Sequence, residues 1–524
     1  MAMLDVIVIG AGHNGLTAAA YLARAGRRVL VLEGRSIVGG YCTTEETVAE
    51  APGFKMNPCA LDCVMTNIPR SVVDELRLAS YGLRFVNPDP WGAFVGPGGE
   101  SIALWRDRRK TIAEIARFSR RDASAFDRFC TVMKDFWWAA APYLQDHPRR
   151  PRARTIAEVA WRAGRGRRHF RQAVRMVISS PEQILEEWFE RDEVKAFLAN
   201  FASVSLLPVQ EPGSGAVLGS AVIYAEFGIN RPIGGSGRFT EAIADCVRAH
   251  GGEVRTDAGV EEVLVGSGGA AEGVRLRDGS ELRARQVVGA VDPTTLMSGL
   301  VDRAHVPEPV RDELRALRTL KYNITNLKGD VALSGRPALA CGRPELWNAF
   351  LLLAPTLDYV RGAQMSCAAG RLPEEIPMWV AMPSAIDRSQ VPAGSDGETL
   401  YVYTPTVPMD LADGRTWDDE VKTEFHDRAL GLLEGYAPGL REKVIGTWIK
   451  GPAELSKTVH RGHVIHVDIS PSQLGPWRPT PSLAGYRTPV AGLWHCGAGA
   501  HPIGLLNGWS GRTTARLVDR ELKA

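Results

Sequence analysis

The first 40 residues alternate short apolar runs with glycine-rich turns. Residues 6–9 form a continuous apolar run, which is typical of a strand buried on both faces. A helix rich in small residues is expected over 16–25, and it ends at Gly26. A second apolar strand follows over 29–32. This order of strand, glycine turn, helix and strand predicts the start of a parallel sheet in an α/β protein.

The same alternation returns in the middle and at the end of the chain. The glycine-rich loop 232–237 is expected to open a helix over 238–250. A short strand at 492–496 enters another glycine-rich turn before a helix over 507–522. Between these regions, strands are expected at residues 253–255, 260–264, 273–277, 281–285 and 287–290.

Two further helix starts carry capping signals. Ser180, followed three residues later by Gln183, forms a capping box and predicts a helix that continues through Phe201. Asp292 directly precedes Pro293, and this order is typical of a helix N-terminus. We therefore interpret Asp292 as a structural cap rather than a catalytic acid.

Three glycines in the first turn fit the spacing G-x-G-x-x-G. Gly10 allows the tight turn, Gly12 lets the backbone approach a pyrophosphate, and Gly15 lets helix and strand pack closely. The N-terminus of the helix offers free N–H groups and a positive dipole end to phosphates. Glu33, directly after the second strand, can accept hydrogen bonds from ribose hydroxyls and argues against a ribose 2′-phosphate. The pattern predicts a dinucleotide site.

The residues after Glu33 distinguish a flavin from a nicotinamide cofactor. They end in Gly39 and Gly40, and the run resembles the Glu-Arg-x-x-x-Gly-Gly run of FAD-binding oxidoreductases in the amine oxidase and phytoene desaturase superfamily. The resemblance implies that this double glycine contacts the FAD pyrophosphate from the other side. The turn at 497–499 would reach the flavin end, where the following helix N-terminus favours negative charge on the reduced ring. FAD is the expected cofactor.

Motifs along the whole chain carry a more specific resemblance. They are residues 12–16, 52–54, 486–489 and 496–502. With them the chain is similar to the phytoene desaturase-related FAD oxidoreductases, closest to the branch called pyridine nucleotide-disulfide oxidoreductase domain protein 2. The resemblance implies an α/β, Rossmann-type FAD-binding domain of the glutathione reductase and amine oxidase type, with an interleaved α+β substrate domain. The FAD domain would comprise 1–80, 225–300 and 455–524, and the substrate domain 81–224 and 301–454.

The motifs and the resemblance together indicate which residues contact FAD. They are Gly10, Gly12, His13, Asn14, Gly15, Glu33, Gly34, Arg35, Gly39, Gly40, Val260, Gly497, Ala498, Leu505, Leu506 and Asn507. The resemblance implies two catalytic candidates, Lys328 in a strand-like run and His501 near the flavin pyrimidine. A surface lysine at a strand edge is the alternative interpretation of Lys328, and His501 can instead hold its own loop.

The implied reaction moves a hydride from a substrate C–H to flavin N5 and releases a neighbouring proton, which forms a C=C bond in a small or lipophilic organic substrate. One alternative is a flavin amine oxidase that forms an imine with oxygen as acceptor. Another is a redox-neutral FAD-dependent isomerase. A third is not an enzyme, because GDP-dissociation inhibitors of small GTPases resemble this fold without FAD. The intact glycine motif with Glu33 argues against that third class.

Composition narrows the possible partners. The 524 residues carry 62 Lys and Arg against 60 Asp and Glu, so no excess of positive charge favours nucleic acid. Eight cysteines without a C-x-x-C pair argue against structural zinc and against a disulfide scaffold. We recognise neither a signal peptide nor an apolar run long enough to span a membrane. A cytoplasmic enzyme with a small-molecule substrate is expected.

One segment departs from this charge balance. Residues 149–175 hold ten arginines and a single acid, Glu158. Because no large apolar moment is recognised beside the arginines, we interpret the segment as a solvated helix face or a loop. Contact with an anionic membrane surface is the alternative, and it would suit a lipophilic substrate and a membrane-peripheral location.

A second cluster raises the question of a metal. His460, His463 and His466 lie close together in the sequence. On an expected strand, the first and the last of them would point to one side and His463 to the other. Three ligands would then not converge, and we expect no metal site.

Overall fold

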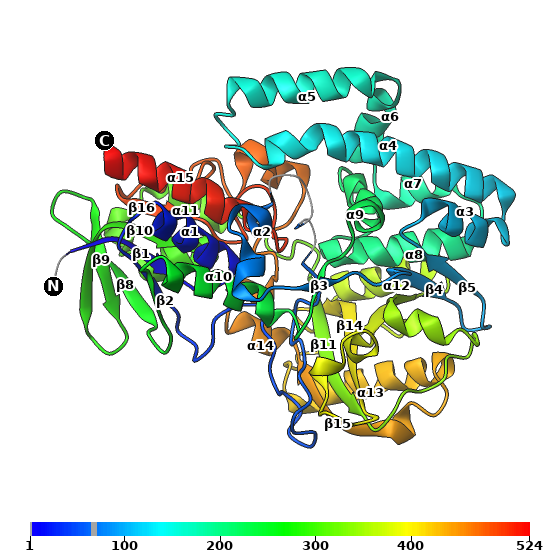
Figure 1. Cartoon of the computed structure of the whole chain (residues 1–524). Coiled ribbons are helices and arrows are strands. Elements are labelled where there is room, and N and C mark those ends of the chain that lie inside the picture. The colour runs from blue at the N-terminus through cyan, green and yellow to red at the C-terminus, as the bar shows by residue number, and fades with distance from the viewer. Residues whose placement is uncertain (1–2, 64–65, 67–70) are drawn as a thin grey trace.

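The molecule is built around two large β-sheets (Figure 1). The computed structural model describes residues 3–63, 66 and 71–524 of the chain. The first sheet has the order β7 (Glu253–Arg255), β2 (Val29–Leu32), β1 (Leu4–Ile9), β10 (Glu281–Gly289), β9 (Ala271–Leu276) and β8 (Val260–Val265), and β16 (Leu493–His495) also pairs with β10. In this sheet β7, β2, β1, β10 and β16 run parallel to one another. In contrast, β9 pairs antiparallel with both β10 and β8. Three distant chain segments therefore build one sheet.

The second sheet is mixed. Its order is β15 (Val444–Lys450), β11 (Ile324–Leu333), β14 (Glu398–Pro408), β13 (Met378–Ala381), β12 (Phe350–Leu353), β4 (Gly92–Val95) and β5 (Ser101–Leu104). Only β4 and β12 pair in parallel within it. A short pair, β3 (Phe85–Val86) with β6 (Arg231–Pro232), lies outside both large sheets. A largely parallel sheet with an antiparallel edge, beside a largely antiparallel sheet, agrees with the predicted fold class. The boundaries of the two domains stay a prediction.

Helices cover both sheets. Beside the first sheet lie α1 (His13–Arg24), α10 (Gly237–Ala249) and α15 (Trp509–Lys523), which share one apolar core with β1 and β2. Against the second sheet lie α8 (Asp192–Ala202), α12 (Leu357–Ala368) and α13 (Asp419–Tyr436). The other helices are α2 (Val72–Glu75), α3 (Arg108–Ala116), α4 (Arg120–Leu144), α5 (Ala153–Arg165), α6 (Arg167–Ile178), α7 (Pro181–Trp188), α9 (Ser220–Phe227), α11 (Glu308–Arg315) and α14 (Pro452–Ser456).

The single helix predicted over 181–201 is wrong, because α7 and α8 are separate. Phe189 is extended between them, with φ −125° and ψ 147°. The buried carboxylate of Asp122 accepts the backbone N–H groups of Glu190 and Arg191 at 2.9 and 2.8 Å. A side chain from α4 thus satisfies the donors that a continuous helix would have paired internally.

Other local expectations have mixed outcomes. The capping box at Ser180 is confirmed by its two hydrogen bonds with Gln183. Asp292 accepts the backbone N–H of Thr295 at 2.9 Å, as expected of a cap. The two separate strands expected at 281–285 and 287–290 are wrong, because β10 runs through both without a break.

The packing of α1 against α15 joins the two ends of the chain (Figure 1). A Cβ atom at Gly511 of α15 would lie 2.1 Å from the backbone oxygen of Asn14 in α1. No side chain fits between the two helices at this point. The N-terminal and C-terminal glycine motifs are therefore held close together.

Replacing Gly511 with alanine is expected to destabilise the protein by about 1–3 kcal/mol, because the added methyl group overpacks the contact with α1. Gly435 in α13 is the matched control, since a Cβ there would meet nothing within 4 Å. Gly435→Ala should stabilise by about 0.5–1 kcal/mol through helix propensity alone. Urea unfolding followed by circular dichroism compares the two variants. Equal shifts for both would contradict the close approach of α1 and α15.

Candidate active site

The first glycine turn has the geometry that its motif predicts. Gly10 adopts φ +94°, and its N–H donates to the carbonyl of Leu32 at 2.8 Å. At Gly15 a Cβ would lie 2.1 Å from the Gly10 oxygen and 2.8 Å from the Cβ of Ala290. The turn therefore requires glycine at both positions, one for backbone conformation and one for close packing.

Gly12 differs from its two neighbours in the motif. Its backbone is extended with φ −69°, and a Cβ there would meet no atom within 4 Å. The N–H of Gly39 donates to the carbonyl of Ala11 at 2.9 Å, and Gly12 and Gly39 form an isolated parallel bridge. Gly40 is equally close, since its Cβ would lie 3.3 Å from the Cα of Gly12. Both glycine motifs thus meet at the N-terminus of α1, beside open space.

The carboxylate of Glu33 is held at the end of β2 by two backbone donors. The N–H of Ala11 reaches Oε2 at 2.9 Å, and the N–H of Arg35 reaches Oε1 at 3.0 Å. Each carboxylate oxygen keeps a further lone pair that can accept from a ribose hydroxyl. The N–H of Ala258 donates to the Glu33 carbonyl at 2.8 Å, and this bond places the start of β8, with Val260, alongside. Next to Glu33, the exposed Gly34 lies against that same segment.

A buried arginine that the sequence analysis missed organises the C-terminal turn. Arg478 donates to the carbonyls of Ala498 and Ala500 at 3.1 and 3.2 Å, and to that of Ile465 at 3.1 Å. Burial lowers the pKa of Arg478 to about 9, although the charge of Asp468 opposes this shift, so the side chain stays positive at neutral pH. A lone arginine carries no motif, and only the fold shows that it lies behind the turn.

The unpaired polar atoms between α1 and α15 fit a polar cofactor. Asn14 Oδ1 and Asn507 Nδ2 are buried and have no hydrogen-bond partner among the described residues. Leaving such an atom unpaired costs about 1–3 kcal/mol, so a ligand is expected to pair them. Burial lowers the pKa of His13 to about 4, although a backbone contact with Leu505 opposes this shift. His13 directly precedes Asn14, and the half-buried Leu505 and Leu506 directly precede Asn507.

His501 follows the C-terminal glycine turn and packs against the end of α4. Its ring is 5.3 Å from that of Tyr143 at the end of α4, and its Nε2 lies 3.3 Å from the Tyr143 carbonyl. Burial lowers the pKa of His501 to about 4. No hydrogen bond, ion pair or ring contact joins His501 to Lys328 within the described residues, so the two catalytic candidates are not brought into contact.

Lys328 occupies the middle of β11, between β14 and β15, and its side chain is only 3% exposed. Its Nζ lies 4.1 Å from the ring centroid of Tyr401 and also contacts the carboxylate of Asp330. Burial lowers the pKa of Lys328 well below its ordinary value, while Cys59 opposes this shift and the charge of Lys450 adds to it. The alternative that Lys328 is a surface lysine at a strand edge is therefore wrong.

A second lysine and the double-glycine segment adjoin Lys328. Lys450 on β15 stands opposite Lys328 in the strand register, and burial lowers its pKa too. The Nζ of Lys450 lies 4.7 Å from the ring centroid of Tyr41, the residue that directly follows Gly40. The chain leaving the glycine motif thus passes against Lys450, the neighbour of Lys328. No local pattern could pair two lysines from distant strands.

Aromatic side chains continue from Tyr401 across the second sheet. The rings of Tyr401 and Tyr403 are 6.3 Å apart, and Tyr403 is 6.3 Å from Trp379. Phe201 of α8 stacks on Trp379 at 4.9 Å and meets the edge of Tyr224 at 5.0 Å. This aromatic cluster gives the surroundings of Lys328 an apolar character.

The histidines at 460–466 do not lie on a strand, so the expected geometry is wrong. The segment forms a short turn over His460–Gly462. His463 bonds to Asp468 at 3.1 Å, and His466 accepts the N–H of Gly499 at 3.2 Å. Within the part of the chain that the structure describes, no group of three metal-binding side chains occurs.

The first sheet carries two glycine motifs and an acidic residue after β2. With the unpaired polar atoms between α1 and α15, these features define a flavin-dependent oxidoreductase. A family model described as flavin containing amine oxidoreductase matches residues 15–327, more than half of the chain. The chain belongs to this family. FAD as cofactor and an enzymatic activity are thereby confirmed, and the non-enzymatic alternative is wrong. Which residues contact FAD stays a prediction.

Known proteins place the chain near the predicted branch. It is 31% identical to the "Pyridine nucleotide-disulfide oxidoreductase domain-containing protein 2" of Rattus norvegicus, over 99% of this chain and 94% of that one. It is 25% identical to a phytoene desaturase (neurosporene-forming) of Rhodobacter capsulatus, over 95% and 90%. An oxidoreductase structure from Methanosarcina mazei aligns with a TM-score of 0.61 at 17% identity, over 99% and 100%. The resemblance and the fold class are confirmed.

Proposed function

We propose that this protein dehydrogenates a lipophilic organic substrate and forms a C=C bond. A hydride leaves one substrate carbon, a proton leaves the neighbouring carbon, and the electron pair left by that proton becomes the new π bond. FAD, when bound, supplies the acceptor of the hydride. Lys328 accepts the proton at Nζ.

The observation that carries this proposal is the environment of Lys328. An amine accepts a proton only when it is neutral. Burial lowers the pKa of Lys328 in the direction of that form, whereas the Asp330 carboxylate that its Nζ contacts favours the charged form. The charge of Lys450 adds to the lowering of the pKa, and the Nζ of Lys450 lies over the ring of Tyr41, the residue after the double glycine. A base is thus available beside the chain segment expected to hold the cofactor.

The aromatic side chains near Lys328 indicate the class of substrate. The aromatic cluster around Tyr401 and Trp379 favours an apolar substrate. One relative is named a desaturase, which supports the formation of a C=C bond.

Oxidation of an amine to an imine is the second candidate, and the description of the matching family favours it. The charge of Lys450, which acts on Lys328, would also repel a cationic amine. We therefore place the desaturase reaction first.

Anaerobic reduction of the flavin tests the proposal. The holoprotein is mixed with an unsaturated hydrocarbon in detergent and, separately, with a primary amine of matched chain length. The hydrocarbon is expected to bleach the flavin band and to yield a product lighter by two hydrogens. Bleaching by the amine alone would overturn the proposal in favour of imine formation. An isomeric product without bleaching would overturn it in favour of an isomerase.

We also propose a cytoplasmic protein that works at a membrane surface, where a lipophilic substrate collects. Among the described residues, no helix is long and apolar enough to cross a bilayer. Contact with a membrane would then depend on a surface element, and the Arg-rich segment offers one.

A further inference from the structure

The arm formed by α5 and α6 lies on the outer side of α4, away from both sheets (Figure 1). Its first helix turns polar groups toward the protein. Thr155 donates to the carboxylate of Asp146. Arg162 donates to the carbonyl of Trp138 at 2.7 Å and to Glu158 at 2.6 Å. An ordinary surface helix has the reverse orientation, with its apolar side inward.

The outward face of α5 is apolar. Ile156 and Trp161 are 57% and 56% exposed, and the ring of Trp161 lies at the edge of this face, 5.7 Å from the ring of Trp138 on α4. Ala157, Ala160 and Gly164 are exposed beside them. Contiguous apolar surface in contact with water marks an interaction site, so this face is expected to have an occupant.

The second helix continues the apolar surface. Phe170, Val174 and Ile178 follow one another at every fourth residue and are 44%, 40% and 64% exposed. The same helix buries Ala173 and Met176 in the core beneath it. An apolar row therefore faces outward in addition to the row that packs inward. The sequence-based view that no apolar pattern accompanies the arginines is wrong.

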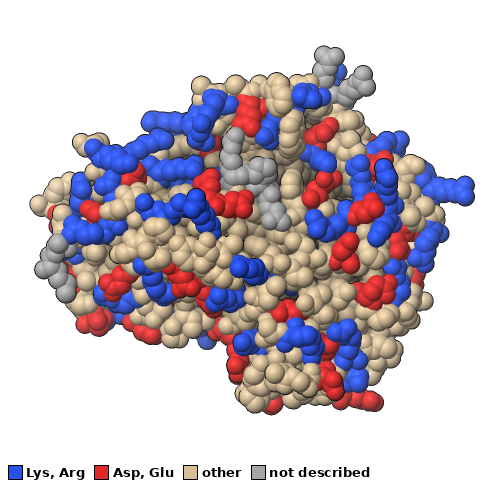
Figure 2. Space-filling view, viewed as in Figure 1, with Lys and Arg blue, Asp and Glu red and all other residues tan. Residues whose placement is uncertain are grey.

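Arginines border both apolar rows. Arg154, Arg165, Arg171 and Arg175 are exposed. In residues 149–175, ten arginines stand against one acid. Lys and Arg side chains also gather over α15 and toward the end of the arm that is nearest to α15 (Figure 2). The segment 149–175 therefore carries a large net positive charge, although Arg175 pairs with Glu187.

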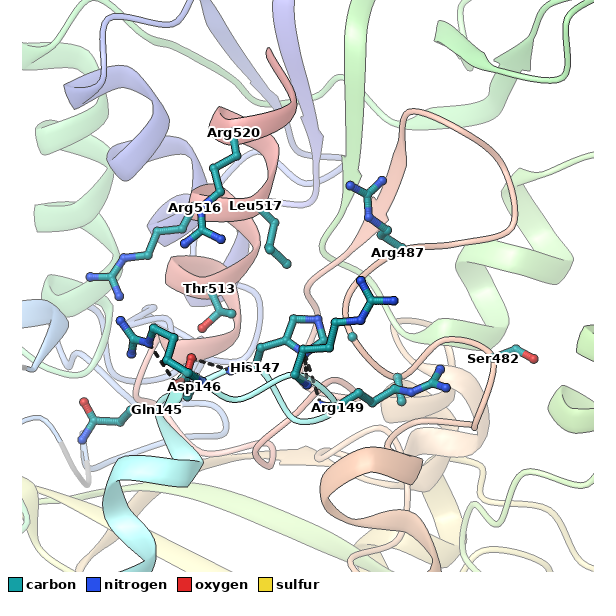
Figure 3. Close-up of a pocket in the computed structure, with 14 residues that line it drawn as sticks. Gln145, Asp146, His147, Arg149, Ser482, Arg487, Thr513, Arg516, Leu517 and Arg520 are labelled. Atoms are coloured by element: carbon teal, nitrogen blue, oxygen red, sulfur yellow. Dashed lines mark hydrogen bonds and ion pairs between the residues drawn. The ribbon is translucent and has the colours of Figure 1, made fainter. Parts of the chain in front are cut away.

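A pocket of about 510 Å³ lies at the base of the arm, and arginines dominate its lining (Figure 3). They come from the loop after α4, from the segment before β16 and from α15, and are Arg149, Arg150, Arg152, Arg487, Arg516 and Arg520. Three of them form ion pairs with acidic side chains. No ion pair with an acid is found for Arg149, Arg150 or Arg520 among the described residues. Such a cluster suits the oxygens of a phosphate group.

We propose that the arm anchors this protein on membranes that contain anionic phospholipid. The apolar rows of α5 and α6 lie among the acyl chains, and the arginine pocket takes a headgroup phosphate. The chain thus docks on the bilayer surface without crossing it.

Two observations favour a membrane over a protein partner or a second copy. Apolar side chains bordered by arginines are typical of helices that lie in the headgroup region, and Trp161 has the amphipathic ring that prefers this depth. A second copy of the chain would bring one positive surface against another, which is unfavourable. Anionic headgroups neutralise that charge.

Vesicle flotation of the holoprotein tests the proposal without any measurement of turnover. Vesicles of phosphatidylcholine mixed equally with phosphatidylglycerol are compared with phosphatidylcholine alone. The protein is expected to float with the mixed vesicles and to be released by salt. If the protein does not float with the vesicles, the proposed oxidation is unaffected. If the flavin is not reduced by the hydrocarbon, the flotation result is unaffected.

Two sets of substitutions locate the contact. The triple variant Ile156→Ser, Phe170→Ser and Ile178→Ser removes exposed side chains only, and is expected to lower partitioning at least tenfold. Its control, Met365→Ser with Leu432→Ser and Ile445→Ser, removes apolar groups elsewhere that are 58%, 40% and 40% exposed, and should bind as the wild type does. Arg150→Gln with Arg520→Gln should weaken binding roughly fivefold per charge on mixed vesicles.

Four outcomes would overturn the proposal. The first is equal binding to both kinds of vesicle, and the second is no binding to either. The third is binding of inorganic phosphate in calorimetry by a protein that ignores vesicles, which would make the pocket a site for a free anion. The fourth is a dimer in light scattering that the triple serine variant dissociates while vesicles remain unbound, which would make the arm a contact between copies.

Discussion

Replacing Gly12 with valine is expected to abolish FAD binding while leaving the fold intact. The backbone at Gly12 has φ −69°, which any residue adopts, and a Cβ there meets no atom within 4 Å. The added side chain would fill the open space at the N-terminus of α1, where the pyrophosphate is expected. Affinity for FAD should fall more than about 100-fold, equivalent to roughly 3 kcal/mol.

Flavin content after purification and titration of the apoprotein with FAD measure this effect. Gly268→Val is the matched control, because a Cβ at Gly268 also meets nothing within 4 Å and lies in the turn between β8 and β9. Gly15→Val would be uninformative, since it collides with the Gly10 backbone and disturbs the fold itself. A Gly12→Val protein that keeps normal flavin content would refute the assigned pyrophosphate position.

The geometry of the first glycine turn was predictable because its determinants are local. Gly10, Gly12 and Gly15 act within a single turn, and each role follows from the space around its own backbone. Glu33 lies at the end of the next strand, within reach of the same turn. Spacing along the chain therefore carries most of the information that the three-dimensional arrangement contains.

The surroundings of Lys328 depend on pairings that no local pattern encodes. Lys328 is buried because β14 and β15 flank its strand, and these bring Tyr401 and Lys450 against it. The break between α7 and α8 has the same origin, since Asp122 comes from another helix. Such long-range contacts decide burial and pKa, and a single sequence does not specify them.

The arm illustrates a third case. The spacing of Phe170, Val174 and Ile178 is visible in the sequence, but an apolar row predicts only that one face is covered. Polar contacts of Thr155 and Arg162 with the protein turn the apolar side of α5 outward. Which face meets water was therefore decided by packing.

Lys328→Met is expected to lower the rate of flavin reduction by the substrate by about 10²–10⁴-fold, the contribution of one positioned base. Methionine nearly matches the length of lysine, and the Asp330 carboxylate that Lys328 contacts keeps its hydrogen bond from Thr47 at 3.0 Å, so flavin content should not change. Single-turnover reduction in stopped flow measures the rate. Lys457→Met, at an exposed lysine after α14, is the control and should react at the wild-type rate.

The pH profile separates a base from a merely structural lysine. Only the neutral amine accepts a proton, so the wild-type rate should rise with pH through the lowered pKa of Lys328 and then level off. Lys450→Met removes a positive neighbour, which raises the pKa of Lys328 and moves this rise to higher pH. Lys328→Met should lose the rise altogether. A profile that is the same in all three proteins would mean that the proton leaves the substrate by another route.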